Sequence, residues 1–338
     1  MTQPLQPPTG PDALHDDLGA APGQTGSDYE VSLQSLSQWE LAWRKFRAHR
    51  LALIGLALMT VLILAAIIGP IFLPYAFDNI PRVDQNVYGG RPPFCATYDN
   101  AKHVCTAFGL VHPMGETGGL QRDVLTLVLN GARVSLFLGF TSMAIGVIIG
   151  TIVGAIAGYV GGFIDNLLMR IVDVLLSLPL LFVILVVARF FQNSKDNVWA
   201  IIMIFGLFGW MGVSRLVRSL FLSIREREFV EAARAVGVRD RRIIFRHILP
   251  NALSPIVVVA SLIIGGNIIG EAFISFLGFG VNPAVPTWGN ILSNALTFIL
   301  VGNWWWPLFP GVAIILTVLA VNFVGDGLRD AFDPRSRA

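Results

Sequence analysis

The sequence is poor in charged side chains. They make up 14% of the 338 residues, while hydrophobic residues make up 54% and the mean hydropathy is +0.66. These values lie outside the range of soluble domains. The net charge of +2 is small, so nucleic-acid binding is not supported. The composition predicts a polytopic membrane protein that is surrounded by lipid.

The chain also lacks the residues that intramembrane chemistry would need. It has no glycine-rich phosphate loop ending in Gly-Lys-Ser or Gly-Lys-Thr, so ATP has to be bound elsewhere. Its histidines stand at positions 15, 49, 103, 112 and 247, all in predicted tails and loops. We therefore expect no catalysis, no cofactor and no metal in this chain. The N-terminus also lacks the pattern of a secretory signal and is expected to be retained.

Six apolar stretches are long enough to cross about 30 Å of hydrocarbon as helices. They predict an all-α integral membrane protein with six transmembrane helices. The stretches lie near 51–74, 132–158, 167–190, 198–217, 253–279 and 304–325.

The distribution of basic residues predicts that both termini are cytoplasmic, because Lys and Arg are enriched in cytoplasmic loops. Basic residues precede the first span, and Arg329, Arg335 and Arg337 follow the last one. The segment 281–303, expected outside, has no Lys or Arg. The loop between the fourth and fifth spans has the densest basic cluster: Arg218, Arg225, Arg227, Arg234, Arg239, Arg241, Arg242 and Arg246.

The segments outside the spans divide into tails and one long loop. Residues 1–30 are predicted to be a disordered cytoplasmic tail, because they have few large apolar side chains. Residues 31–50 predict an amphipathic segment, either on the inner membrane surface or as an extension of the first span. The first transmembrane helix is assigned to 51–75, the external loop to 76–123, a core with the other five transmembrane helices to 124–330 and a cytoplasmic tail to 331–338.

Two cysteines lie ten residues apart in the predicted external loop, Cys95 and Cys105. An oxidising exterior would allow a disulfide between them. Metal ligation with His103 and His112 is the alternative, but the spacing matches no established metal site. The disulfide is therefore favoured.

A few polar and small residues within the spans need an explanation, because ionisable groups in hydrocarbon are costly. Asn267 and Glu271 either line a translocation pathway or form hydrogen bonds between helices, and the second reading is favoured. Arg170 and Asp173 are placed to pair on one helix face. A glycine at every fourth position predicts close helix packing in the second span: Gly146, Gly150, Gly154 and Gly158.

The segment 218–252 predicts two short helices that protrude as a docking surface. Glu231, Ala232 and Ala233 lie in the first helix, which Gly237 can end because glycine adopts a left-handed conformation. Asp240 is expected to cap the second helix, which is expected to stop at Pro250.

These residues resemble the EAA motif of ATP-binding-cassette importer permeases. The matching positions are Glu231, Ala232, Ala233, Gly237, Leu249 and Pro250, while His247 stands where an aliphatic residue is usual. The HILPN form at 247–251 is similar to the oligopeptide and dipeptide branch. The segments 131–140, 165–181, 270–290 and 310–334 resemble the C-type subunit of that branch.

The resemblance implies a type I importer permease fold in a bacterial cytoplasmic membrane. In this family the EAA helix fits a groove on a cytoplasmic ATPase, so Glu231, Ala232, Ala233 and Gly237 would be coupling contacts. Two ATPase subunits binding ATP and Mg, a homologous B-type permease and an external substrate-binding protein are the implied partners. The implied cargo is a dipeptide or oligopeptide. Glutathione or a nickel chelate is the alternative, and an ion-coupled secondary transporter is the rival class.

Overall fold

The computed structural model describes most of the chain from Gln38 onward, which forms a single compact unit. The predicted tail 1–30, the start of the amphipathic segment and nearly all of the tail 331–338 lie outside the described residues. The described residues are 38–72, 90–99, 104–109, 112–117, 122–191, 197–300 and 302–332.

In the part of the chain that the structure describes, five long apolar helices are able to cross a membrane, and a bent pair of helices gives a sixth crossing if it counts as one span. The five long helices are α2 (Arg50–Phe72), α3 (Val124–Val160), α6 (Asn197–Arg225), α9 (Leu249–Phe276) and α11 (Trp305–Phe332). Large apolar side chains on these helices are widely exposed, for example Phe72 at 80% and Ile152 at 55%. Such exposure suits contact with lipid.

The third predicted span, 167–190, is not one straight helix. It divides into α4 (Gly162–Ser177) and α5 (Leu180–Phe191), with an angle of 80° between the two helices. Leu178 between them is extended, with φ −73° and ψ 137°. Pro179 explains the break, because a proline disfavours the helical conformation of the residue before it.

The N-terminal helix α1 (Gln38–Ala48) is separate from α2. Its Ala42 and Phe46 are buried against the C-terminal part of α11, in a cluster with Ala52 and Ala331. Trp43 is 53% exposed. The helix therefore uses part of its apolar face to contact its own chain, which neither of the two expected arrangements included.

The glycine repeat of α3 packs against α6, as the spacing predicts. A Cβ added at Gly150 would lie 2.6 Å from the Cβ of Val213, and one at Gly154 would lie 2.4 Å from the carbonyl oxygen of Ser214. Both distances are too short for real Cβ contacts. The absence of side chains thus lets the two helix backbones approach closely.

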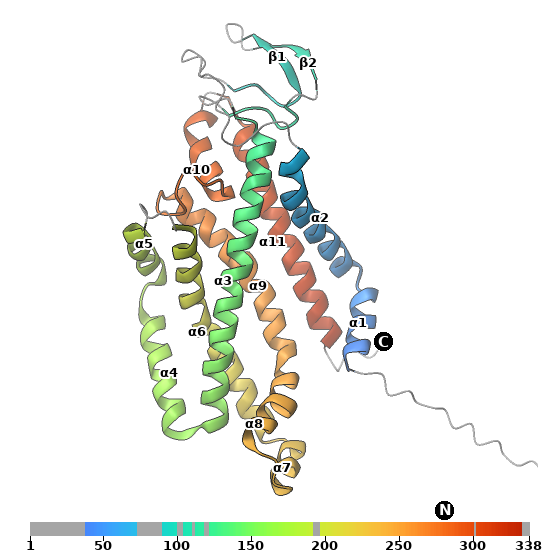
Figure 1. Cartoon of the computed structure of the whole chain (residues 1–338), viewed down its shortest axis with the longest axis vertical. Helices are drawn as coiled ribbons and strands as arrows, with labels where there is room; N and C mark the ends of the chain where they lie inside the picture. Colours follow the sequence, from blue (N-terminus) through green and yellow to red (C-terminus); the bar gives the residue numbers. More distant parts are fainter. Residues whose placement is uncertain are drawn as a thin grey trace, which may run out of the picture. The chain divides into compact units, whose positions relative to one another are not determined.

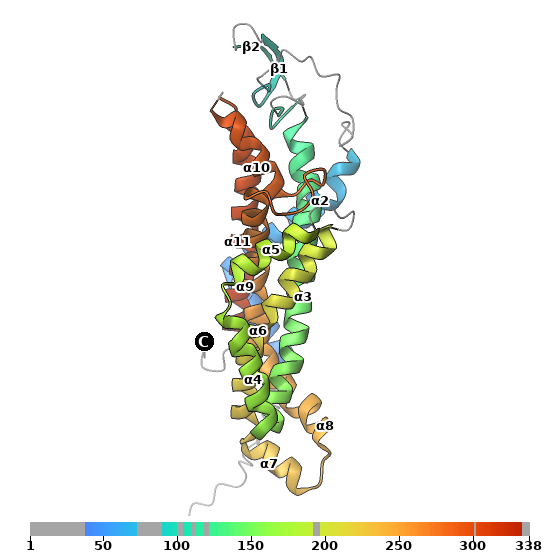
Figure 2. The same ribbon diagram turned by 90° about the vertical axis from the view of Figure 1, so that its left-hand side faces the viewer.

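The region between α2 and α3 contains a β-hairpin that the sequence did not predict. Strands β1 (Cys95–Asp99) and β2 (Val104–Phe108) pair antiparallel, and a disulfide joins Cys95 to Cys105 across them, with a Cα–Cα distance of 5.8 Å. Figures 1 and 2 show the hairpin beyond the end of the bundle at which α3 begins. A further short helix, α10 (Trp288–Ile299), lies in the segment 281–303, for which the sequence predicted no helix.

A buried ionic cluster holds the region between α2 and α3 against the start of α3. His112 contacts Glu116 through Nε2 at 2.8 Å and Asp123 through Nδ1 at 3.1 Å. Asp123 also caps α3 by accepting a hydrogen bond from the backbone N–H of Thr126. The indole of Trp305, at the start of α11, donates to the carbonyl oxygen of Glu116. His112 therefore joins Glu116 to the N-cap of α3, and the backbone of Glu116 is in turn bonded to the start of α11.

We expect this cluster to loosen at alkaline pH. Hydrogen bonds to Asp123 and then Glu116 raise the pKa of His112 from 6.5 to about 9. Because protonation is favoured in the folded state, the stabilisation, about 3 kcal/mol, is complete below pH 6.5 and is lost as the pH rises through about 9. Hydrogen exchange of residues 112–126 should accelerate over this interval.

The matched variants for that measurement are His112→Gln and His49→Gln. The first should abolish the alkaline step, and the second should keep it. Arg91 also pairs with the cluster, 3.4 Å from Glu116, and is unchanged in both variants. An unchanged alkaline step in His112→Gln would contradict the assignment.

Candidate functional site

The loop between α6 and α9 begins with helix α7 (Glu228–Ala235), which contains the Glu-Ala-Ala sequence. The helix ends as predicted at Gly237, which has φ +76°. The backbone N–H of Gly237 donates to the carbonyl of Arg234, and that of Val238 donates to the carbonyl of Ala233. This pair of hydrogen bonds is the Schellman motif, in which a left-handed residue closes the helix.

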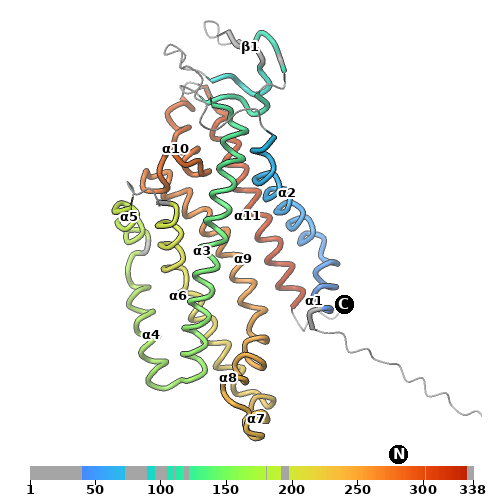
Figure 3. The backbone as a smooth tube through the Cα atoms, viewed as in Figure 1, coloured from blue at the N-terminus to red at the C-terminus, as the bar shows by residue number. Residues whose placement is uncertain are grey.

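The second half of the loop does not stop at Pro250. Helix α8 (Asp240–Ile243) leads through a π-helical turn at 244–248 into α9, so the helical segment is continuous from Asp240 to Phe276; its backbone can be followed in Figure 3. Pro250 is the second residue of α9, directly after the π-helical turn, and the helix continues through it. The expected cap is also wrong, because Asp240 is the first residue of α8 and Arg239 is its N-cap.

Only some side chains of the Glu-Ala-Ala motif are exposed. Glu231, Ala232 and Pro250 are exposed, Ala233 is buried, and His247 and Leu249 are half-buried. Apolar side chains flank them, with Val236 79% and Phe245 61% exposed. An open hollow of about 450 Å³ adjoins this surface, lined by Arg239, Arg241, Arg242 and Phe245. The loop therefore exposes apolar groups with a rim of positive charge, a composition typical of protein interfaces.

A shared core attaches the loop to the membrane helices. Val230 and Ala233 of α7 are buried beside Phe221 of α6 and Ile248 of the π-helical turn. The same cluster continues into α9 through Ala252 and Ile256. A force applied to the exposed face of α7 would therefore act directly on α6 and α9.

A second anchor connects the loop to the end of α3 and was not predicted. The hydroxyl of Tyr159 donates to Asp240 at 2.5 Å, and its ring faces the guanidinium of Arg234 at 5.7 Å. Arg225 donates to the carbonyl oxygens of Gly158 and Tyr159 at 3.1 and 3.3 Å. Tyr159 thus contacts both helices of the loop from a third element.

Ion pairs join α4 to α6 near the same end of the bundle. Arg218 binds Asp165 with two hydrogen bonds, and Arg215 binds Asp173. The pairing of Asp173 differs from the expected partner, Arg170, on the same helix. Arg215 lies within hydrogen-bond distance of the Asp173 carboxylate, and this ion pair adds a contact between α4 and α6.

Asn267 and Glu271 are buried in α9 and contact their own chain. The amide of Asn267 donates to Ser142 of α3 at 2.7 Å, and Ser275 donates to Glu271 at 2.7 Å. Glu271 is 1% exposed. The bond of Asn267 joins two helices, as expected, whereas the bond of Glu271 lies within α9. A place for either residue in a translocation pathway stays a prediction. Over the described residues, no group of three or more His, Cys, Asp or Glu side chains could hold a metal ion.

We expect the Tyr159 anchor to be measurable as a coupling energy. Tyr159→Phe keeps the ring but removes the donor to Asp240, and a hydrogen bond to a charged group contributes about 1.5–3 kcal/mol. Hydrogen exchange of α7 and α8 should become faster in Tyr159→Phe and in Asp240→Asn. The double variant should add little to either one. Fully additive effects would contradict the contact.

Comparison with known proteins supports a single family. Residues 150–338 match the family described as binding-protein-dependent transport system inner membrane component. Residues 37–93 match the N-terminal transmembrane domain of oligopeptide transport permease C.

Relatives of nearly the same length are found in several bacteria. The dipeptide transport system permease protein DppC of Bacillus subtilis is 37% identical, over 91% of this chain and 89% of the relative. The oligopeptide transport system permease protein OppC is 38% identical in Haemophilus influenzae, over 91% and 92% of the two chains. Its Escherichia coli counterpart is 35% identical, over 91% and 95%.

A solved structure shows the same fold. A chain of the MetNI methionine ABC transporter, in inward-facing conformations, superposes with a TM-score of 0.50 at 22% identity, over 61% of this chain and 96% of that chain. The match to the family extends over more than half of the sequence and includes the loop with the Glu-Ala-Ala helix. The chain therefore belongs to the binding-protein-dependent transport system inner membrane components, and within them to the C-type peptide permeases.

Proposed function

We propose that this chain is the permease subunit of an ATP-driven importer of dipeptides or oligopeptides. The observation that carries the proposal is the exposed face of α7, which presents Glu231 and Ala232 beside a rim of arginines. This face is suited to bind a cytoplasmic partner, and the core behind it leads into α6 and α9. Relatives named as dipeptide and oligopeptide permeases support the choice of cargo.

The working complex in this proposal contains more than one chain. Two cytoplasmic ATPase subunits bind ATP and Mg themselves, and the EAA loop (218–252) docks against an ATPase. Glu231, Ala232, Ala233 and Gly237 are the coupling contacts, and His247, Leu249 and Pro250 support them. A B-type permease forms the other half of the membrane part. An external substrate-binding protein delivers the cargo on the far side of a bacterial cytoplasmic membrane, with both termini of this chain inside.

The proposal is tested by purifying tagged chain from native membranes and identifying its companions by mass spectrometry. Cassette ATPases and a second permease should accompany the wild type. Glu231→Lys should lose the ATPases but keep the permease. Glu226→Lys is the matched control, since Glu226 lies in the same loop with a side chain that is 72% exposed. Purification of the wild type without an ATPase would refute the proposal.

Cargo and energy source are tested separately by uptake into cells. A labelled dipeptide and a labelled tetrapeptide should enter only when the chain is present, and uptake should stop when ATP is depleted. Loss of uptake on adding an ionophore, with ATP held constant, would favour the secondary transporter. Uptake of glutathione or a nickel chelate in place of peptides would keep the importer and change its cargo.

A further inference from the structure

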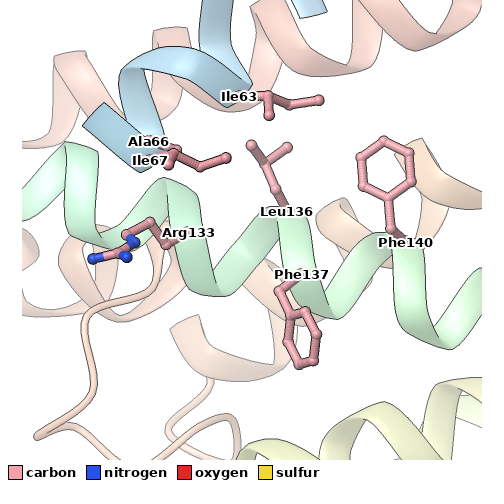
Figure 4. A pocket seen from close by; sticks show the side chains of 7 residues that line it. All are labelled: Ile63, Ala66, Ile67, Arg133, Leu136, Phe137 and Phe140. Carbon is pink, nitrogen blue, oxygen red and sulfur yellow. The ribbon is translucent and has the colours of Figure 1, made fainter. Parts of the chain in front are cut away.

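An apolar groove opens between α2 and α3. It has a volume of about 460 Å³. Figure 4 shows Leu136 of α3 directed toward Ile63 of α2, with Phe140 farther along α3. The full lining is Ile63, Ala66, Ile67, Arg133, Leu136, Phe137 and Phe140.

One lining residue is cationic. Arg133 is exposed, and in the described part of the chain it has no hydrogen-bond or ion-pair partner. Its side chain runs along α3 toward the helix N-terminus, away from Phe140 (Figure 4). The groove thus has apolar walls and one free positive charge at its end.

The length of α3 places Arg133 near the edge of the hydrocarbon. The helix has 37 residues, which is about 55 Å, so a span centred in about 30 Å of hydrocarbon projects by about 13 Å at each end. Arg133 lies nine residues after the helix start, about 14 Å along the axis. Phe137, one turn deeper, packs edge-on against Trp199 at a ring distance of 5.5 Å. Tryptophan favours this interfacial level.

We propose that the groove is a binding site for an anionic phospholipid. One acyl chain lies along Ile63, Leu136 and Phe140, and the headgroup phosphate pairs with the guanidinium of Arg133. Charge complementarity selects this occupant, because an uncharged apolar helix would leave the guanidinium without a counter-ion. The predicted topology assigns the site to the outer leaflet. The inference requires only that the chain spans the membrane, so it is independent of the transported cargo.

The lipid preference is tested on the complete purified complex by native mass spectrometry. Phosphatidylglycerol and phosphatidylcholine with the same acyl chains are added in turn. Phosphatidylglycerol should bind about fivefold more tightly, the effect of one basic residue on an anionic lipid. Arg133→Gln should remove this preference. The same change at another exposed arginine, Arg170→Gln, should keep it. Equal binding of both lipids to the wild type, or a preference that persists in Arg133→Gln, would overturn the proposal.

The occupancy of the groove is tested by a bulky substitution. Ile67→Trp should lower the retention of both lipids severalfold, because Ile67 lines the groove and is 52% exposed. Ile152→Trp is the control, since Ile152 is 55% exposed on α3 outside the groove. A benzophenone attached to Ile67→Cys in native membranes should cross-link to phospholipid. Cross-links to the second permease, or to another segment of this chain, would show that protein fills the groove and would overturn the proposal.

Discussion

Replacing Gly237 with valine is expected to reduce ATPase copurification about tenfold while leaving the membrane bundle folded. Gly237 has φ +76°, and an added Cβ would meet nothing within 4 Å. The cost is therefore conformational, about 1–2 kcal/mol for an L-residue and more for a branched one. A cost of this size lowers the population of loops in which Gly237 ends α7 correctly by about tenfold. The apparent affinity for the ATPase falls in proportion to that population.

Gly278 supplies a matched control for this experiment. It has φ +81° and also has nothing within 4 Å of an added Cβ. It ends α9 with the same pair of hydrogen bonds, from Gly278 to Ser275 and from Phe279 to Ile274. Gly278→Val should therefore have a similar cost but keep the ATPases. If both variants lose the ATPases equally, general destabilisation explains the effect and the coupling role of Gly237 is wrong.

The second large effect is expected at the contact between α3 and α6. Gly154→Ala would place a methyl group 2.4 Å from the carbonyl oxygen of Ser214 and 2.7 Å from the Cβ of Val217. Neither atom can move without shifting α6. The expected destabilisation is about 1–3 kcal/mol, the range for overpacked cores, and should appear as a lower melting temperature and a severalfold lower yield of folded complex.

The control for that prediction is on the facing helix. Gly212 of α6 is exposed, and a Cβ there would meet nothing within 4 Å. Gly212→Ala should be neutral or stabilising by up to about 1 kcal/mol, because alanine favours helix more than glycine does. Equal effects of the two substitutions would mean that the close packing at Gly154 does not contribute to stability.

The features that could be predicted from the sequence are those that local chemistry determines. Apolar length predicted the spans, the four-residue spacing from Gly146 to Gly158 predicted helix packing, and Gly237 predicted the end of α7. Each depends on residues close together in the chain. The order of residues around Glu231 was also sufficient to indicate the family, because the motif is contained within a single loop.

Prolines were the local signal that was interpreted incorrectly. Pro250 was expected to end a helix, yet the π-helical turn before it lets the helix continue. Pro179 lies inside an apolar run whose length predicts one helix, and it breaks the third span. The same residue type can start or end a helix, depending on whether the N–H that it lacks would have been bonded.

Contacts between distant residues could not be predicted at all. Tyr159 and Asp240 are 81 positions apart, and Asp173 pairs with an arginine 42 positions away. Neither tyrosine nor aspartate has a local pattern that identifies such a partner. These contacts arise only when α3, α4 and α6 come together, so the anchors of the loop could be seen only in the fold.

The continuous helix from Asp240 to Phe276 has a mechanical consequence. Its 37 residues correspond to about 55 Å, so a tilt of about 10° about one end would displace the other by about 10 Å. The helix can act as a lever that is held at one end by the EAA loop. A small rotation imposed at the loop would thereby be magnified at the far end of the helix.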